Sequence, residues 1–182
     1  VLLNRGDGTF DAPAVLLPAG KVWSMTALDL DGDGRAEVAL VGMELQILDL
    51  PDGGKPALGH PIRIPENGNS VAAADLDGDG RVDVAVGCIP KLKGLIWVRW
   101  GEAPAGGKPG GDPTVSEFPC PIAPFYCAGA ADLDGDGKPD LVFEDNVTSR
   151  IAIAWNEGKR SFRFGEPVFL PKILLPLGCA DL

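Results

Sequence analysis

Short apolar runs alternate with small or polar stretches along the whole chain. The runs at 38–41, 84–86 and 141–143 are rich in branched residues and too short for helices, which is typical of strands. Each follows an acidic, glycine-containing stretch, and small apolar residues precede that stretch at 25–28, 71–74 and 128–131. Two further strand candidates follow in each unit, at 45–48 and 61–65, at 95–100 and 115–118, and at 151–155 and 167–171. The pattern predicts an all-β chain with four strands per unit.

The acidic stretch is one nonapeptide, and it occurs three times. It reads DLDGDGRAE from Asp29, DLDGDGRVD from Asp75 and DLDGDGKPD from Asp132, and a fourth copy begins at Asp181. The copies start about 50 residues apart, a period that indicates a repeat architecture. The opening segment 1–10 aligns with 153–162, so that Asn4 and Gly6 correspond to Asn156 and Gly158. We therefore expect this segment to be the closing hairpin of a preceding unit.

The nonapeptide has the composition of a loop for a hard cation. Carboxylates at positions 1, 3, 5 and 9 converge only if the backbone wraps tightly, and glycines at positions 4 and 6 permit such turns. Calcium accepts six to eight oxygens, so the carbonyl at position 7 (Arg35, Arg81 or Lys138) is a further candidate ligand. Zinc is disfavoured because the loops hold no nitrogen or sulfur ligands. Position 12 is apolar in all three copies, which excludes EF-hands.

The DLDGDG string followed by a strand, together with the hairpin sequence of 4–10, resembles the FG-GAP and VCBS repeats of integrin α-subunit propellers and secreted bacterial proteins. The resemblance implies a partial β-propeller, with three to four four-stranded blades of a ring of about seven. It also implies about three calcium ions, one per loop. The expected metal residues, including those that offer a carbonyl, are Asp29, Asp31, Asp33, Arg35 and Glu37; Asp75, Asp77, Asp79, Arg81 and Asp83; and Asp132, Asp134, Asp136, Lys138 and Asp140. Because Glu37 replaces the usual Asp, we expect a weaker first site.

The repeats divide the chain into one partial propeller domain, 1–182. Its expected parts are the closing strands of a blade at 1–20, blades at 21–65, 66–122 and 123–171, and the start of another at 172–182. A Gly/Pro-rich insertion at 101–113 lengthens the second blade. An open propeller would expose unpaired strand edges, so we expect the remaining blades of a longer polypeptide, or a second copy, to cover them.

Charge and cysteine content give information on the binding partners and the cellular compartment of the protein. The net charge is −10, each loop contributes four acidic residues, and no basic stripe is present, which argues against a nucleic-acid partner. No apolar segment is long enough to span a membrane. Weak calcium sites suit an extracellular protein, secreted or at the cell surface, with the periplasm as an alternative. A disulfide between Cys120 and Cys127 and a pair of free thiols are both consistent with the sequence, whereas Cys88 and Cys179 are interpreted as free buried thiols.

The sequence favours a calcium-binding scaffold for protein recognition or adhesion, with a protein or a glycan as ligand. One alternative is a carbohydrate-binding lectin, which requires exposed aromatic residues such as Trp23 or Trp100; packing between blades is the favoured role of the tryptophans. A second alternative is the accessory domain of a secreted enzyme. The only histidine, His60, has no nucleophile and acid partners in the sequence, so we expect no enzyme activity.

Overall fold

The computed structural model describes residues 1–2, 4–13, 15–18, 20–51, 55–89, 93–101, 114–145 and 147–170, apart from the side chains of 127 and 128. These residues form fourteen strands and no helix, which confirms the all-β prediction. Four sequence-based predictions lie outside the described residues. They concern the insertion beyond Gly101, the Cys127 side chain, Cys179 and the next blade at 172–182.

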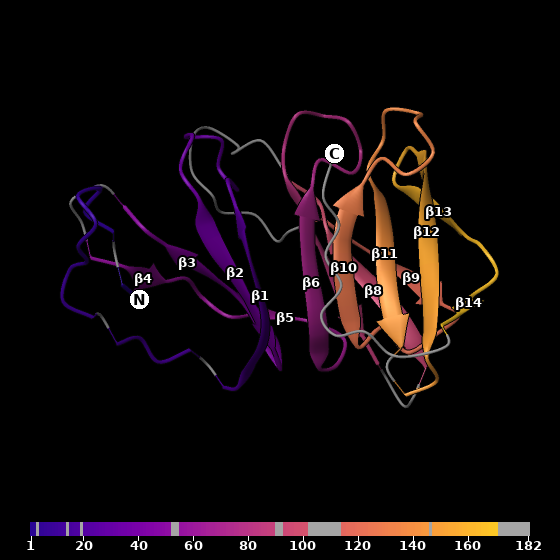
Figure 1. Ribbon diagram of the computed structural model, residues 1–182, viewed down its shortest axis with the longest axis horizontal. Coiled ribbons are helices and arrows are strands. Elements are labelled where there is room, and N and C mark those ends of the chain that lie inside the picture. Colours follow the sequence, from indigo (N-terminus) through magenta and orange to yellow (C-terminus); the bar gives the residue numbers. More distant parts are fainter. Residues whose placement is uncertain are drawn as a thin grey trace.

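The strands form three antiparallel sheets (Figure 1). The first sheet contains β1 (Val22–Leu28), β2 (Glu37–Gly42) and β3 (Glu44–Asp49), with β4 (Ala57–Leu58) and β5 (Ile62–Arg63) both paired to β3. The second sheet contains β6 (Gly68–Ala74), β7 (Asp83–Cys88), β8 (Gly94–Arg99) and β9 (Val115–Cys120). The third sheet contains β10 (Tyr126–Ala131), β11 (Asp140–Asp145) and β12 (Arg150–Gly158), with β13 (Ser161–Phe164) and β14 (Val168–Phe169) both paired to β12. Each sheet is one propeller blade.

The outermost strand differs from the sequence prediction in two sheets. In the first sheet the predicted strand 61–65 is only the short β5, and β4 precedes it on the same partner strand. In the third sheet the predicted strand 167–171 is the short β14, and β13 precedes it on the same partner strand, where the predicted hairpin 153–162 returns. Proline donates no amide hydrogen, so Pro61 and Pro167 interrupt the ladder and split the outer strand into two short pieces.

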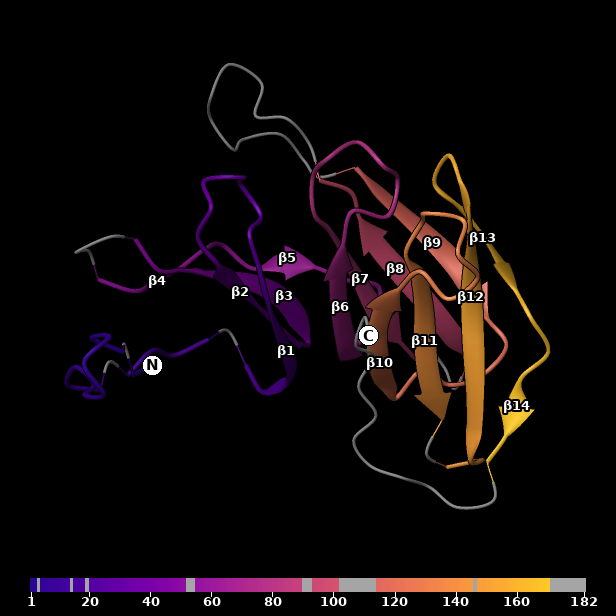
Figure 2. The same cartoon turned by 45° about the horizontal axis from the view of Figure 1, so that its top comes forward.

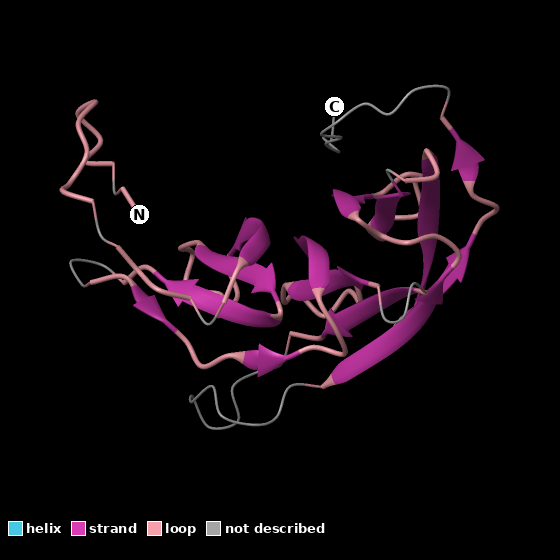
Figure 3. Ribbon diagram, turned by 90° about the horizontal axis from the view of Figure 1, so that it is seen from below, coloured by secondary structure: helices cyan, strands magenta, loops and turns pink. Residues whose placement is uncertain are grey.

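The three sheets follow an open arc, which is clearest from below (Figure 3). The first strand of each sheet lies innermost, because β6 packs beside both β1 and β10. Two of the inner strands consist largely of small residues, GNSVAAA in β6 and YCAGAA in β10, whereas β1 (VWSMTAL) also carries larger side chains. Gly68, at the start of β6, leaves no space for a side chain, since an added Cβ would lie 2.4 Å from Val41 of the first sheet. The small residues noted in the sequence therefore permit close approach of neighbouring blades.

Alternate residues of the second sheet pack against opposite neighbours. Val84, Val86 and Cys88 of β7 join a buried cluster with residues of the first sheet. Ala85 of the same strand joins the cluster between the second and third sheets. Trp100, which follows β8, is fully buried in this second cluster. The period of two places one core layer between each pair of blades.

The tryptophans confirm the packing interpretation for two positions. Trp97 and Trp100 are buried, at 3% and 0% exposure, so neither presents a ring surface to a ligand. Trp155 is half-buried, and Trp23 on β1 is 46% exposed. The suggestion that Trp100 stacks on a sugar is therefore wrong, because the indole fills the space between two blades.

The N-terminal segment forms the predicted turn. Asn4 and Phe10 make an isolated antiparallel bridge, and the Asn4 side chain accepts a 2.9 Å hydrogen bond from the Gly6 amide. Asn156 accepts an equivalent 2.9 Å bond from Gly158 in the third sheet. Gly6 and Gly158 both adopt positive φ, 81° and 74°. The two turns thus begin with the same hydrogen bond and the same glycine conformation, as their alignment predicts.

Candidate metal centre

The three nonapeptides form loops between the first two strands of each sheet. We call 29–37, 75–83 and 132–140 the first, second and third loop. They join β1 to β2, β6 to β7 and β10 to β11. All three lie at the same edge of the arc (Figures 1 and 2). The predicted order of strand, loop and strand is confirmed in every repeat.

The first aspartate of each loop holds the backbone turn. In the second loop, the two carboxylate oxygens of Asp75 accept hydrogen bonds from the amides of Gly78 and Gly80, both at 2.8 Å. These glycines have φ of 78° and 83°, a region that side-chain-bearing residues rarely adopt. Asp29 and Asp132 make the same pair of bonds in their own loops, at 2.8 and 2.9 Å. Positions 1, 4 and 6 therefore form one hydrogen-bonded unit.

The acidic residue at position 9 clamps the loop from the far side. Asp83 accepts from the Leu76 amide at 2.7 Å and from the Gly101 amide at 2.6 Å, so it joins the loop to the end of β8. Asp140 makes the corresponding bonds to Leu133 and Asn156, at 3.1 and 2.8 Å. Glu37 accepts from Leu30 at 2.7 Å. These three carboxylates are buried and perform a structural role that the sequence analysis did not foresee.

The residue at position 7 pairs with the carboxylate at position 5 in every loop. Arg35 contacts Asp33 at 2.7 Å, Arg81 contacts Asp79 at 2.5 Å, and Lys138 forms an ion pair with Asp136. The hydrogen bond from Arg35 holds the pKa of Asp33 below its ordinary value, and the bond from Lys138 does the same for Asp136. The predicted role of the position-7 carbonyl oxygens in metal binding stays a prediction.

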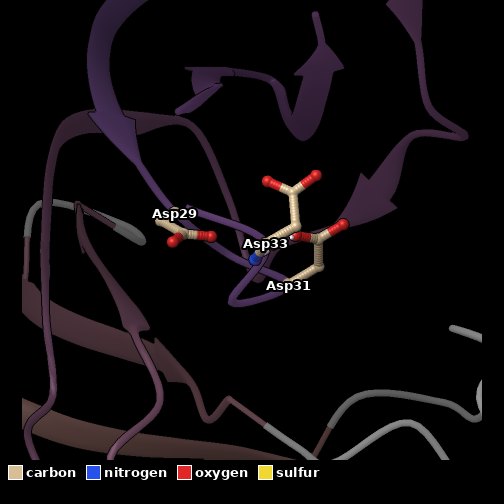
Figure 4. A group of neighbouring side chains, drawn as sticks. All are labelled: Asp29, Asp31 and Asp33. Atoms are coloured by element: carbon tan, nitrogen blue, oxygen red, sulfur yellow. Dashed lines mark hydrogen bonds between the residues drawn. The ribbon is translucent and has the colours of Figure 1, made fainter. Parts of the chain in front are cut away.

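The chain contains three groups of carboxylates, and within each group the carboxylates lie close enough to bind one ion. Asp29, Asp31 and Asp33 form the first group, which Figure 4 shows around its loop. The other groups are Asp75, Asp77 and Asp83 in the second loop and Asp132, Asp134 and Asp136 in the third. Within each group the ligand oxygens lie within 4.8 Å of one another. The grouping takes position 9 only in the second loop and position 5 only in the other two, so the full expected ligand set stays a prediction.

The donor chemistry fits a hard divalent cation. Every group offers carboxylate oxygens alone, as calcium prefers, and contains no imidazole or thiolate. Burial raises the pKa of Asp83 to about 6, although two backbone amides oppose the shift, and Asp77 and Asp79 add to it. Burial likewise raises the pKa of Glu37. The loops therefore concentrate negative charge that a bound cation would offset.

The third sheet also reaches the second loop. The Asn156 side-chain amide donates to the Leu76 carbonyl at 2.7 Å and to the Pro139 carbonyl at 3.0 Å. Arg160, in the turn after β12, donates to Asp77 at 2.8 Å. Neither contact was predicted for the site. The alignment of Asn156 with Asn4 marked a turn residue, but only the packing of two blades shows what the turn touches.

A surface depression of about 920 Å³ lies away from the loops, between the second and third sheets. Its lining is mostly apolar, with Asp145 and Arg150 at its polar side. The Asp145 carboxylate already accepts bonds from the amides of Val147 and Thr148. His60 lies between β4 and β5 and is exposed, so it is not part of this depression.

The remaining cysteine prediction is partly resolved. Cys88 and Cys120 are buried and free. The free-thiol interpretation therefore holds for Cys88, and for Cys120 it replaces the disulfide alternative. None of the described residues belongs to a helix that is long and apolar enough to cross a membrane.

Comparison with known proteins gives matches to two family models. Residues 1–40, which contain the N-terminal hairpin and the first loop, match the FG-GAP-like repeat. Residues 67–87, which contain β6 and the second loop, match the FG-GAP repeat. A search of curated proteins found no match. FG-GAP repeats are generally non-catalytic scaffolds and are typical of extracellular or surface proteins. The chain thus carries FG-GAP repeats in these two segments, and its repeated loops and antiparallel blades give it the fold of a partial β-propeller.

Proposed function

We propose that the chain is a calcium-binding β-propeller scaffold of an extracellular protein, which presents a surface for recognition of, or adhesion to, a protein or glycan ligand. One observation carries the proposal: three loops at one edge of the arc each gather three carboxylates whose oxygens lie within 4.8 Å. Calcium would supply positive charge that offsets their mutual repulsion. The chain's own residues hold the loops ready, because positions 1 and 9 accept backbone amides.

The scaffold role follows from where the loops lie. Each joins the innermost strand of a blade to the strand beside it, so an ion there cross-links the two strands near the blade contacts. A ligand that binds only the folded state stabilises that state by mass action, about 2.7 kcal/mol per site when its concentration is 100-fold above Kd. Extracellular calcium is abundant enough to fill sites with Kd of roughly 10⁻⁴ to 10⁻³ M.

The lectin alternative loses two of the tryptophans. Trp97 and Trp100 are buried, whereas Trp23 is 46% exposed, the most exposed tryptophan among the described residues. A glycan ligand would need its stacking platform near β1, at the first sheet.

We propose no catalytic role, because the carboxylates of the loops are held by backbone amides and by the cationic residues at position 7.

Calcium titration of the chelator-treated chain, followed by calorimetry, tests the proposal. We expect binding to about three sites and a rise in Tm with calcium, with weaker effects of magnesium, which demands stricter octahedral geometry. Replacing position 3 by asparagine in all three loops (Asp31→Asn, Asp77→Asn and Asp134→Asn) should abolish both effects. Asparagine retains the oxygen that accepts the position-5 amide, as at Asp31 and Asp33, so the turn should survive.

A matched control is Asp7→Asn. Asp7 accepts the Thr9 amide at 2.9 Å in a similar local turn, but it lies outside the loops. This variant should bind calcium as the wild type does. A wild-type chain whose Tm is the same in chelator and in millimolar calcium would disprove the metal function.

A further inference from the structure

Arg160 links the third sheet to the second loop. Its Nε donates to Oδ2 of Asp77 at 2.8 Å. Asp77 belongs to the group of carboxylates that could hold an ion in this loop, and its side chain is only 9% exposed. Its other oxygen, Oδ1, accepts the Asp79 amide at 3.1 Å. One carboxylate therefore faces both a fixed cation and the candidate metal position.

The guanidinium of Arg160 is held in place from behind. Its central carbon lies 4.9 Å from the centroid of the Trp100 ring, within the range of a cation–π contact. Trp100 is itself fixed, because it is fully buried and its indole nitrogen donates to Ser116 at 2.9 Å. Arg160 is thus positioned before any metal arrives, and an arginine keeps its charge at every physiological pH.

The first and third loops differ from the second in this respect. Asp31 and Asp134, which correspond to Asp77, are exposed. Within the part of the chain that the structure describes, no ion pair joins either of them to a neighbouring blade. The pairs between positions 5 and 7 are common to all three loops, so they do not distinguish one loop from another.

We propose that Arg160 is an internal counter-ion of the second loop, which lowers the affinity of that loop for a divalent cation and holds the loop against the third blade when metal is scarce. This inference rests on the proposed calcium function. A positive charge a few Å from a ligand oxygen opposes the entry of a second cation, because two like charges repel. The same charge offsets the repulsion among the carboxylates while the loop is metal-free.

A site-resolved calcium titration tests the proposal on the whole chain. The amides of Gly34, Gly80 and Gly137 each donate to the first aspartate of one loop, so their NMR shifts report the three sites separately. In Arg160→Gln, we expect the Gly80 transition to move to ~10-fold lower calcium, since one nearby positive charge is lost. The Gly34 and Gly137 transitions should keep their wild-type midpoints. In chelator, the same variant should melt at a lower temperature than the wild type.

Arg163→Gln is the matched control. Arg163 lies on β13 and pairs with Glu157 at the exposed surface, so the variant removes the same charge from the same hairpin without touching the second loop. All three transitions should remain as in the wild type. Arg160→Gly provides a second test if the glutamine variant folds poorly. Arg160 has a φ of 60°, which glycine adopts without strain, and the aligned residue of the N-terminal hairpin is Gly8.

The outcomes separate the two proposals. A Gly80 midpoint that is unchanged or moves to higher calcium in both Arg160 variants, while Gly34 and Gly137 respond, overturns the role of Arg160 alone. If the NMR shifts of all three glycine amides do not change with calcium in the wild type, the calcium function is disproved, and this inference with it. A tighter second loop in Arg163→Gln would show a general charge effect and would also overturn the specific role of Arg160.

Discussion

The second and third loops have nearly the same sequence but different surroundings. Both begin with DLDGDG, and both make the same bonds from positions 4 and 6 to the first aspartate. Yet Leu76 of the second loop is 2% exposed, whereas the equivalent Leu133 of the third loop is 43% exposed. Leu76 belongs to the core cluster between the second and third sheets, and Asn156 and Arg160 of the third sheet also contact the second loop. The repeat therefore specifies the local turn, and the neighbouring blade determines how open and how charged the site is.

The aromatic ring that contacts Arg160 contributes most to the difference between the two loops, and Trp100→Ala removes it. Trp100→Ala should destabilise the chain by about 3–5 kcal/mol, because a fully buried indole leaves a cavity between two blades. Arg160 should then lose its aromatic contact, and the second loop should become as exposed as the third. Urea unfolding measures the loss. Trp23→Ala, at a position that is 46% exposed, should change the unfolding free energy much less, by about 0.5 kcal/mol. Equal effects of the two variants would contradict the packing role of Trp100.

A smaller change removes the polar link alone. Asn156→Ala should cost about 1–3 kcal/mol, because the Leu76 and Pro139 carbonyls lose a buried donor. It should also increase hydrogen exchange at the second loop more than at the third. Asn4→Ala is the control, since Asn4 makes the same bond within its own turn but is exposed. If Asn4→Ala destabilises the chain as much, the turn and not the inter-blade contact explains the effect.

The smallest expected effect concerns the face of the third sheet that points away from the second. Glu144 on β11 is fully buried, and neither carboxylate oxygen has a hydrogen-bond partner among the described residues. The corresponding residues of the other sheets, Val41 and Gly87, face the next blade. Burial raises the pKa of Glu144 above its ordinary 4.5. The folded state then binds the proton more tightly than the unfolded state, so stability falls as pH rises above about 4.5 through the raised pKa.

Glu144→Gln removes this titration. The variant should be more stable than the wild type at neutral pH, and the difference should shrink as the pH is lowered towards 4.5. Thermal unfolding in chelator across that range measures it, with Glu157→Gln at the exposed surface as the control. A stability difference that does not change with pH would show that Glu144 has the same pKa in the folded and unfolded states, which would contradict the raised pKa.

Local features of the repeats could be predicted from the sequence. The branched runs mark β2, β7 and β11, and the two glycines of each loop mark positive φ, because both follow from the chemistry of a few adjacent residues. The contact of Arg160 with Asp77 could not be predicted, since the two residues lie 83 positions apart and meet only when two blades pack. Metal binding by position 9 stays a prediction, whereas the two backbone amides that Asp140 accepts could not be predicted, because no spacing rule indicates them.

Each of the two core layers contains one buried thiol, so the reactivity of that thiol reports when the layer opens. Cys88 belongs to the layer between the first and second sheets, and Cys120 to the layer between the second and third. Burial raises their pKa to about 12 and about 11, so little reactive thiolate exists while the layers stay closed. The rate at which a thiol reagent modifies each cysteine would therefore time the parting of one pair of blades independently of the other.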